Sequence, residues 1–393
     1  MKCYYIDRYI FFLESAPEVN IMMPLKYHYT VNNKKFINFF DAHDYAHENS
    51  NFVDFKLSRK DIESFCSVDV EELATKNIVE LYKNKLSWAR DNFSKLRFLY
   101  SGGTDSQTIM EISQELGINF DEVLTELCSI KGDPELDTEY LPAIEYLTGK
   151  KIKNFHLIRP EIKHYEIYKD PMWVKDVCAS HYFSFRGAKF DIVLREREQM
   201  TCLTGQDKPF IYVDAAGKYY WVVADHSFSE DMRSDQLCFF IDSFMPEVAV
   251  KQAYMAKKFL QDFYPNWRGL FKNTHRMPTR DKRNYLKYLG RVKPLSPLTL
   301  DPTLMGKGSP PYVSKKHTGA MEELERIGRG DLVQSFFDSI NEVKERYKHH
   351  QHCFEIDAKG HPIAVGRWAA VFELGDNVIT HVDDSVIDLS LRS

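Results

Sequence analysis

Residues 101–106, with the sequence SGGTDS, combine several groups that bind phosphate and magnesium. The hydroxyl groups of Ser101, Thr104 and Ser106 are hydrogen-bond donors for an anion. The carboxylate of Asp105 would by itself repel a phosphate. That repulsion disappears if a Mg²⁺ ion bridges the carboxylate and the phosphates. The run therefore predicts a site for a phosphate compound together with Mg²⁺.

The flanking sequence predicts that a strand leads this run to the start of a helix. The short run 96–100, apolar except for Arg97, indicates a buried strand. A helical pattern follows from 104, and its expected end is Gly117. Gly102 and Gly103 permit positive φ angles and close approach of an anion to the backbone. In a strand–turn–helix unit, free N–H groups and the positive end of the helix dipole point into one concavity.

The run differs from two common phosphate loops, because no Gly-Lys-Ser/Thr follows the glycines and the spacing is not Gly-x-Gly-x-x-Gly. It resembles the Ser-Gly-Gly-x-Asp-Ser signature of the PP-loop ATP pyrophosphatases, which cleave ATP between the α- and β-phosphates. The resemblance implies that ATP and Mg²⁺ bind residues 101–106 and that Asp105 is a catalytic, metal-binding residue. The alternative is a Gly-Gly turn in an unrelated α/β domain.

Further strand and helix patterns follow the loop in alternation. Residues 123–130 indicate a second strand, 137–149 a helix and 155–158 a third strand. Such a series predicts an α/β fold with a doubly wound parallel sheet, in which ligands bind at the carboxyl ends of the strands. The resemblance puts the adenine at the end of the second strand. The residues there are Leu127, Cys128 and Ser129, for each of which a purely structural role is equally open.

Another predicted strand, residues 200–204, ends in Gly205-Gln206-Asp207-Lys208. Asparagine synthetases have a strand at this place that ends in Ser-Gly-Glu-Gly-Ala-Asp-Glu and holds pyrophosphate and magnesium. The resemblance implies that Gly205 binds the nucleotide and that Asp207 is a second catalytic acid and metal ligand. The loop is about two residues shorter here, so a simple strand-ending turn remains the alternative. Lys208 is a candidate counter-charge for phosphate, or a solvated lysine.

The closest resemblance is to the synthetase domain of asparagine synthetases, in which a helix precedes the loop strand, as the pattern over 68–93 predicts here. Lys2 stands where glutamine amidotransferases have their cysteine, which implies a separate source of ammonia. The expected activity is that of an ATP-dependent carbon–nitrogen ligase. A carboxylate or carbonyl oxygen of a small-molecule substrate is adenylated, pyrophosphate leaves, and a nitrogen nucleophile then displaces AMP.

Two other functions are weighed against this one. A PP-loop enzyme that modifies a nucleobase or nucleic acid is the first alternative. The thiolating relatives use cysteine pairs and the deazaguanine-forming relatives a zinc cluster, and the sequence shows neither pattern. A nucleotide-binding module without chemistry is the second, but pure binding does not require the acid Asp105.

Length and composition indicate two or three domains with a substantial core, since 44% of the 393 residues are hydrophobic. We expect an N-terminal α+β segment (1–67), a PP-loop ATP-binding domain (68–245) and a basic, mainly helical C-terminal region with a terminal hairpin (246–393). Seven scattered cysteines without a Cys-x-x-Cys pair favour reduced thiols and a cytoplasmic protein. The sequence contains no uncharged apolar run of membrane-spanning length, so no membrane association is expected.

The region from 251 to 293 contains twelve Lys or Arg residues among aromatic ones. Such a stretch can hold phosphates and stack bases, although it is usually a solvated helix face. A nucleic-acid partner is not favoured, because the net charge of the chain is −5. Because the SGGTDS run lacks a lysine, cations must reach the triphosphate from elsewhere. The candidates are Lys251, Lys257, Lys258, Arg280, Lys282 and Arg283.

The remaining patterns predict secondary structure without a function. Residues 210–213 and 219–223 indicate a hairpin, which would be a flap over the site or an unrelated addition. Helical patterns cover 161–199, 245–263 and 320–347.

Overall fold

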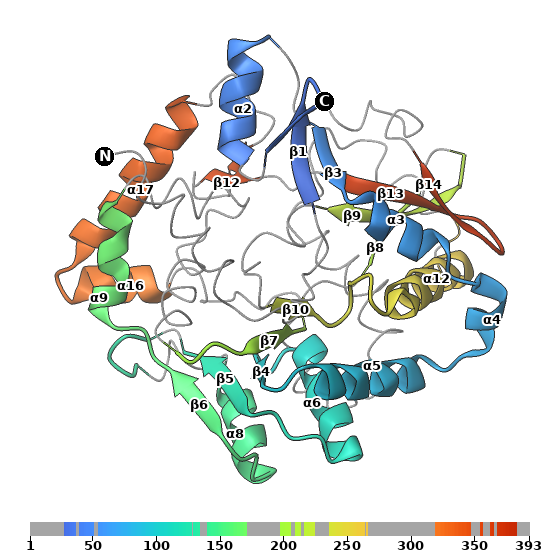
Figure 1. Cartoon of the computed structure of the whole chain (residues 1–393). Helices are drawn as coiled ribbons and strands as arrows, with labels where there is room; N and C mark the ends of the chain where they lie inside the picture. The colour runs from blue at the N-terminus through green and yellow to red at the C-terminus, as the bar shows by residue number, and fades with distance from the viewer. Residues whose placement is uncertain are drawn as a thin grey trace.

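The computed structural model describes residues 27–36, 39–50, 54–127, 129–133, 140–170, 197–205, 209–213, 216–224, 236–263, 265, 319–346, 354–356, 362–364 and 368–382. Within these ranges the chain is a mixed α/β protein built around a five-stranded parallel sheet (Figure 1). Among the described helices, none is long and apolar enough to cross a membrane.

The parallel sheet has the strand order β10-β7-β4-β5-β6. Its strands are β4 (Leu96–Leu99), β5 (Glu122–Glu126), β6 (Phe155–Ile158), β7 (Thr201–Thr204) and β10 (Gln236–Cys238). From the central β4 the chain first adds β5 and β6 on one side and later β7 and β10 on the other. The order therefore reverses between β4 and β7, and ligands of open parallel sheets bind at the carboxyl ends beside such a point.

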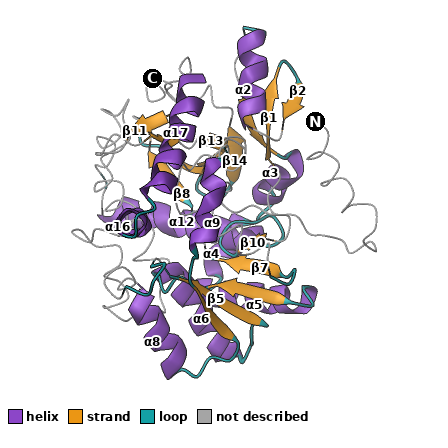
Figure 2. Cartoon of the chain, turned by 90° about the vertical axis from the view of Figure 1, so that its left-hand side faces the viewer, coloured by secondary structure: helices purple, strands orange, loops and turns teal. Residues whose placement is uncertain are grey.

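The helices that connect the first three strands are α6 (Thr104–Leu116) and α8 (Leu141–Gly149). Right-handed crossovers that advance in one direction put their helices on one face of a sheet. Figure 2 shows α6 and α8 on the same side of β5. As the sequence predicts, α6 ends at Gly117, whose φ of 64° is left-handed, and the N–H of Ile118 bonds back to the carbonyl of Ser113 at 2.9 Å.

The prediction of one continuous helix over 68–93 is wrong, because two helices occupy this stretch. They are α4 (Val70–Thr75) and α5 (Ile78–Asn92). Asn77 is the N-cap of α5, and its side-chain oxygen accepts a hydrogen bond from the N–H of Val79 at 2.8 Å. Asparagine is among the best N-cap residues, so the apolar periodicity continues through a point where the backbone restarts.

The helix predicted over 320–347 is also two helices in the structure, α16 (Gly319–Arg326) and α17 (Gly330–Arg346). Gly328, with a φ of 79°, lies in the break, where a glycine adopts the left-handed conformation without a steric penalty. The helix expected near 245–263 is α12 (Pro246–Phe263). Of the helical prediction for 161–199, the structure describes α9 (Ile162–Tyr165) and the 3₁₀ helix η2 (Glu166–Lys169), while residues 171–196 lie outside the described ranges.

A second sheet has the order β14-β13-β9-β8 and is antiparallel. Its strands are β8 (Phe210–Val213), β9 (Tyr219–Ala224), β13 (Trp368–Leu374) and β14 (Ile379–Val382). The predicted hairpin over 210–223 and the terminal hairpin are both confirmed. The pairing between them joins β9, from the segment expected over 68–245, to β13, from the segment expected over 246–393.

Smaller sheets complete the described structure. At the N-terminal side the order is β2-β1-β3, accompanied by α2 and α3, and a short pair, β11-β12, precedes β13. These elements are β1 (Tyr27–Val31), β2 (Lys34–Phe36), α2 (Phe39–Glu48), β3 (Asp54–Leu57), α3 (Arg59–Cys66), β11 (Phe354–Ile356) and β12 (Pro362–Ala364). The strands and helices described before residue 67 lie within the expected N-terminal segment (1–67), whose boundary stays a prediction.

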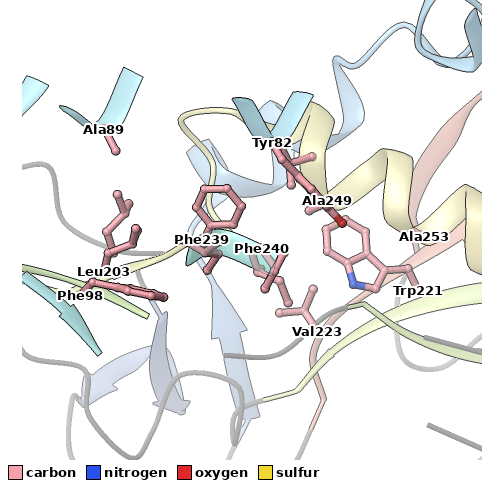
Figure 3. Packing of buried hydrophobic residues seen from close by; sticks show 14 of the residues in the cluster. Tyr82, Ala89, Phe98, Leu203, Trp221, Val223, Phe239, Phe240, Ala249 and Ala253 are labelled. Carbon is pink, nitrogen blue, oxygen red and sulfur yellow. The ribbon is translucent and has the colours of Figure 1, made fainter. Parts of the chain in front are cut away.

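One hydrophobic cluster connects the parallel sheet to the second sheet. Figure 3 shows Tyr82 of α5 close to Phe239 and Phe240, which follow β10, with Trp221 of β9 beside α12. The ring of Trp221 lies 4.8 Å from that of Phe65 in α3 and is stacked on a further ring in β13. These aromatic contacts join strands and helices that lie far apart in the chain.

Buried ion pairs lie at the amino ends of β4 and β5. The guanidinium of Arg97 is ion-paired with Glu122 and also donates to the carbonyl of Glu198 at 2.8 Å. Arg197 forms a second ion pair with Glu122. The side chain of Arg97 is only 2% exposed, so these partners replace the water that it loses on folding.

Candidate functional site

The turn after β4 is held in shape by its own hydroxyl groups. Gly102 has a φ of 64°, a conformation that favours glycine. The hydroxyl of Ser106 accepts from the N–H of Ser101 at 3.3 Å and donates to the carbonyl of Gly103 at 3.1 Å. The hydroxyl of Ser101 accepts from the N–H of Gly103 at 3.3 Å. Both serine hydroxyls thus form hydrogen bonds within the turn. The backbone that a phosphate would contact is therefore already organised.

Gly103 is the N-cap of α6 and has no side chain with which to cap it. Its carbonyl accepts the first bond of the helix, from the N–H of Gln107 at 2.8 Å. The N–H groups of the first turn of any helix have no acceptor within the helix, and they lie at the positive end of its dipole. Thr104 begins the helix and Asp105 lies half-buried in this first turn. The predicted strand–turn–helix geometry is confirmed, whereas phosphate binding stays a prediction.

Gly205 brings the end of β7 into contact with this turn. Leu99 of β4 pairs with Thr204 of β7, so the chain leaves the two strands side by side. A Cβ atom on Gly205 would lie 3.1 Å from the backbone nitrogen of Ser106 and 3.2 Å from the carbonyl carbon of Asp105. A side chain at this position would fit only if the neighbouring backbone moved by a few tenths of an ångström, so a glycine favours this close approach. The two segments that the resemblance assigns to one pyrophosphate site therefore lie against each other. Asp207 and Lys208 fall outside the described residues, and their roles stay predictions.

Asp105 has a buried aromatic neighbour, Tyr82 of α5. Burial is the main reason that the pKa of the Tyr82 hydroxyl is raised, and the negative charge of Asp105 raises it further. Gln252 of α12 donates its side-chain amide to the Tyr82 hydroxyl oxygen at 2.7 Å. The phenol consequently stays protonated, and its hydrogen bond with Gln252 links α5 to α12.

The described residues that follow β5 are Leu127 and 129–133, at the end of the strand that pairs with β4. The hydroxyl of Thr125 donates to the carbonyl of Tyr100 at 2.9 Å, which links the ends of β5 and β4. Leu127 is buried against Tyr140. The hydroxyl of Ser129 accepts from the N–H groups of Gly132 and Asp133 at 2.7 and 2.6 Å. Leu127 and Ser129 thus have structural partners, whereas Cys128 lies outside the described residues. Adenine binding by these three residues stays a prediction.

The described lysines of the basic stretch bind the protein itself. Lys251 donates to the carbonyls of Leu73 and Ala74 at 2.8 and 2.9 Å, and burial lowers the pKa of its ammonium group. The ammonium of Lys257 donates to the carbonyl of Leu374, the last residue of β13, and to that of Gly375, which follows it, at 2.8 and 2.9 Å. Lys258 is paired with an aspartate one helical turn away, at 3.3 Å. The first two ammonium groups are therefore poor candidates for a triphosphate, and the remaining three candidates, Arg280, Lys282 and Arg283, fall outside the described ranges.

Sequence reasoning overlooked a buried cation near the same core. Lys85 of α5 and Asp242 form an ion pair at 2.6 Å, and neither side chain is more than 1% exposed. Lys85 lies one turn after Tyr82 on the buried face of α5. A lysine at a position where the periodicity demands an apolar residue was the available signal.

The described residues contain no group of three or more His, Cys, Asp and Glu side chains that could hold a metal ion. Asp105 offers one carboxylate beside the N-terminus of α6. Mg²⁺ is commonly held by one or two carboxylates together with the phosphates of a substrate, so this donor set fits a metal that arrives with a nucleotide.

No protein-family model matches the chain, and a search of curated proteins gave no match either.

Proposed function

We propose that the protein is an ATP pyrophosphatase of the PP-loop type, and in particular an asparagine synthetase-like carbon–nitrogen ligase. The observation that carries the proposal is the contact of Gly205 with the 101–106 turn at the start of α6. Two glycine-containing segments converge there at the carboxyl ends of β4 and β7, beside the reversal of strand order. The same proposal implies a doubly wound sheet, with the connection from β6 to β7 on the face opposite α6 and α8.

The chain's own groups would bind and orient ATP at this point. The first-turn N–H groups of α6 would bind its phosphates, with Lys208 as a further candidate cation. Asp105 and Asp207 would hold Mg²⁺, which neutralises phosphate charge when bound. The main catalytic contributions would be positioning and electrostatic stabilisation of the charge that develops on the phosphates.

The reaction would proceed in two balanced steps. A carboxylate or carbonyl oxygen of a small-molecule substrate attacks the α-phosphorus of ATP, and the bond to pyrophosphate breaks. A nitrogen nucleophile, supplied as ammonia from a separate source, then attacks the activated carbon. The carbon–oxygen bond to AMP breaks, AMP leaves with the electron pair, and the attacking nitrogen loses one proton to solvent.

Modification of a nucleobase or nucleic acid is the second candidate, and it is supported by the basic character of residues 251–293. The contacts of Lys251 and Lys257 with backbone carbonyls weaken it, because those cations are already used. A gel-shift titration with single-stranded and duplex oligonucleotides at two salt concentrations separates the candidates. Tight, salt-sensitive binding would favour the nucleic-acid substrate.

The main test is the identity of the cleaved bond. The purified protein is incubated with Mg²⁺, ATP, ammonia and pools of carboxylic acids, and the products are separated. We expect AMP and pyrophosphate, together with exchange of labelled pyrophosphate into ATP in the presence of the correct acid. Formation of ADP and phosphate would contradict the proposal.

A further inference from the structure

A carboxylate from the C-terminal half of the chain is buried in the loop after β5. Glu323 of α16 accepts hydrogen bonds from the N–H of Lys131 at 2.9 Å and from the N–H of Ile130. The hydroxyl of Ser129 donates to the same carboxylate at 3.2 Å. The side chain of Glu323 is fully buried. This contact joins residues that are more than 190 positions apart in the sequence.

These bonds determine the shape of the loop. A buried carboxylate is strongly unfavourable unless donors surround it, and here three donors converge on it. Without the carboxylate, the N–H groups of Ile130 and Lys131 would lose their acceptor. Two arginines add to the attachment. Arg326 of α16 binds Asp133 at 2.8 Å, and Arg159, after β6, donates to the carbonyl of Ser129 at 2.7 Å.

The helix pair α16–α17 is also attached to the segment after β6. Arg329, between the two helices, forms an ion pair with Glu166 of η2, and Lys169 of η2 pairs with Asp331 of α17 at 3.2 Å. Figures 1 and 2 both show α16, α17 and α9 grouped together. The helix pair therefore contacts the chain beyond the carboxyl ends of both β5 and β6.

The loop held in this way neighbours the candidate phosphate site. β5 pairs directly with β4, and the Thr125–Tyr100 bond links the two strand ends. A nucleotide whose phosphates bind at the start of α6 would have its nucleoside near the carboxyl end of one of the two strands that flank β4, which are β5 and β7. On the β5 side, the nucleoside would meet Leu127 and residues 129–133.

We propose that Glu323 is a positioning residue for the base of the nucleotide. By fixing residues 129–133 it would make the end of β5 a rigid wall on the base side of the site. This inference depends on the proposed function, because it takes a nucleoside triphosphate as the ligand. It deepens that function by separating the chain into a part that binds phosphates and a part, completed by α16, that binds the base.

Calorimetric titration of the full chain with two Mg²⁺ complexes, of ATP and of inorganic tripolyphosphate, tests this separation. Tripolyphosphate has the phosphates without the nucleoside. We expect Glu323→Ala to raise the Kd of ATP tenfold or more, which corresponds to the loss of one or two hydrogen bonds to the bound nucleotide. The Kd of tripolyphosphate should stay within about twofold of the wild-type value. Glu322→Ala, an exposed glutamate on the same helix, is the matched control and should change neither Kd.

Other outcomes would overturn the inference. Equal weakening of both ligands would show a general structural defect, and an unchanged ATP affinity would remove the role of Glu323. If wild-type protein bound neither ligand, the proposed function itself would fail, so the two failures are distinguishable. If Glu323→Ala does not fold, Glu323→Gln, which keeps one acceptor oxygen, takes its place with a smaller expected effect.

Hydrogen exchange on the wild-type chain tests the same inference without a variant. ATP should slow amide exchange at Leu127 and in residues 129–133, whereas tripolyphosphate should not. Protection by tripolyphosphate alone, or no protection by ATP, would contradict a base-side wall at this loop.

Discussion

The two ends of the parallel sheet are built from different chemistry. At the amino ends, Arg97, Glu122 and Arg197 satisfy one another's charges in a buried cluster. At the carboxyl ends, β4 and β7 lead into glycines, and the turn at 101–106 presents the start of α6. Charges that are already paired contribute to stability and offer little to a ligand. Small residues and helix N–H groups leave room and donors for one. Substitutions at the two ends should therefore separate stability from activity.

The largest effect is expected at the carboxyl end, for Asp105→Asn. The amide has the same shape but no charge to hold Mg²⁺, so ATP turnover should fall roughly 1000-fold, as for loss of a principal electrostatic group. The free energy of unfolding should change by less than about 1 kcal/mol, because the side chain is only half-buried. AMP formation and urea denaturation measure the two quantities. An unchanged rate at saturating Mg²⁺ would refute the metal-binding role.

The opposite behaviour is expected at the amino end, for Arg97→Met. Without the guanidinium of Arg97, the buried carboxylate of Glu122 loses one of its ion-pair partners. The free energy of unfolding should therefore fall by about 3 kcal/mol. Turnover per folded molecule should stay within about twofold of wild type. Arg59→Met provides the control, because the ion pair of Arg59 with Glu63 is exposed and contributes little. A loss of turnover without loss of stability would contradict the division between the two ends.

The pH dependence of stability sharpens the same comparison. Burial acts to raise the pKa of Glu122, but hydrogen bonds from Arg197 and Arg97 outweigh it and hold the pKa below its ordinary value of 4.5. Among the described residues, His156 also faces Glu122, with its Nε2 3.9 Å from the carboxylate. A depressed carboxyl pKa stabilises the fold above about pH 4.5, and this contribution is lost as the pH falls through the folded-state pKa.

The corresponding variant is Glu122→Gln. It should be less stable than wild type by about 2 kcal/mol at pH 7, and the difference should shrink as the pH falls below 4.5. Thermal denaturation over a pH series measures this. A difference that does not depend on pH would mean that the charge of Glu122 is not the stabilising feature.

The smallest effect is expected for Gly205→Ala. The added methyl group would lie 3.1 Å from the nitrogen of Ser106, so the turn must shift by a few tenths of an ångström. We expect about a tenfold loss of ATP affinity, about 1.4 kcal/mol, with normal folding. Gly149→Ala is the matched control, because a Cβ there has no neighbour within 4 Å. Equal ATP affinity in the two variants would remove the argument for convergence at Gly205.

Local sequence patterns predicted the elements of the site and failed where long-range contacts decide the structure. The strand over 96–100, the glycine turn and the helix ending at Gly117 follow from an apolar run, two glycines and a C-terminal glycine. The break at Asn77 was missed because apolar periodicity continues across it. The break at Gly328 was missed for the same reason, although a glycine within a helical pattern is a recognised signal.

The parts of the site that were missed come from distant segments. The resemblance assigned Gly205 to the site, and the structure shows that this residue contacts the turn. Glu323 could not be assigned, because nothing in the helical pattern around it indicates which loop its carboxylate binds. Lys85 was visible only as a charge on an apolar face. Pairing of β9 with β13 was equally out of reach, since strand periodicity specifies a face and not a partner.

The pairing of β9 with β13 has a consequence for the order in which the chain is made. β9 is complete at Ala224, whereas its partner strand begins at Trp368. At ordinary rates of translation the ribosome needs on the order of ten seconds to make the intervening chain. During that interval the edge of β9 is open to pairing with other chains. Biogenesis of this protein should therefore be sensitive to nascent-chain chaperones, and a premature stop before Trp368 should yield aggregates.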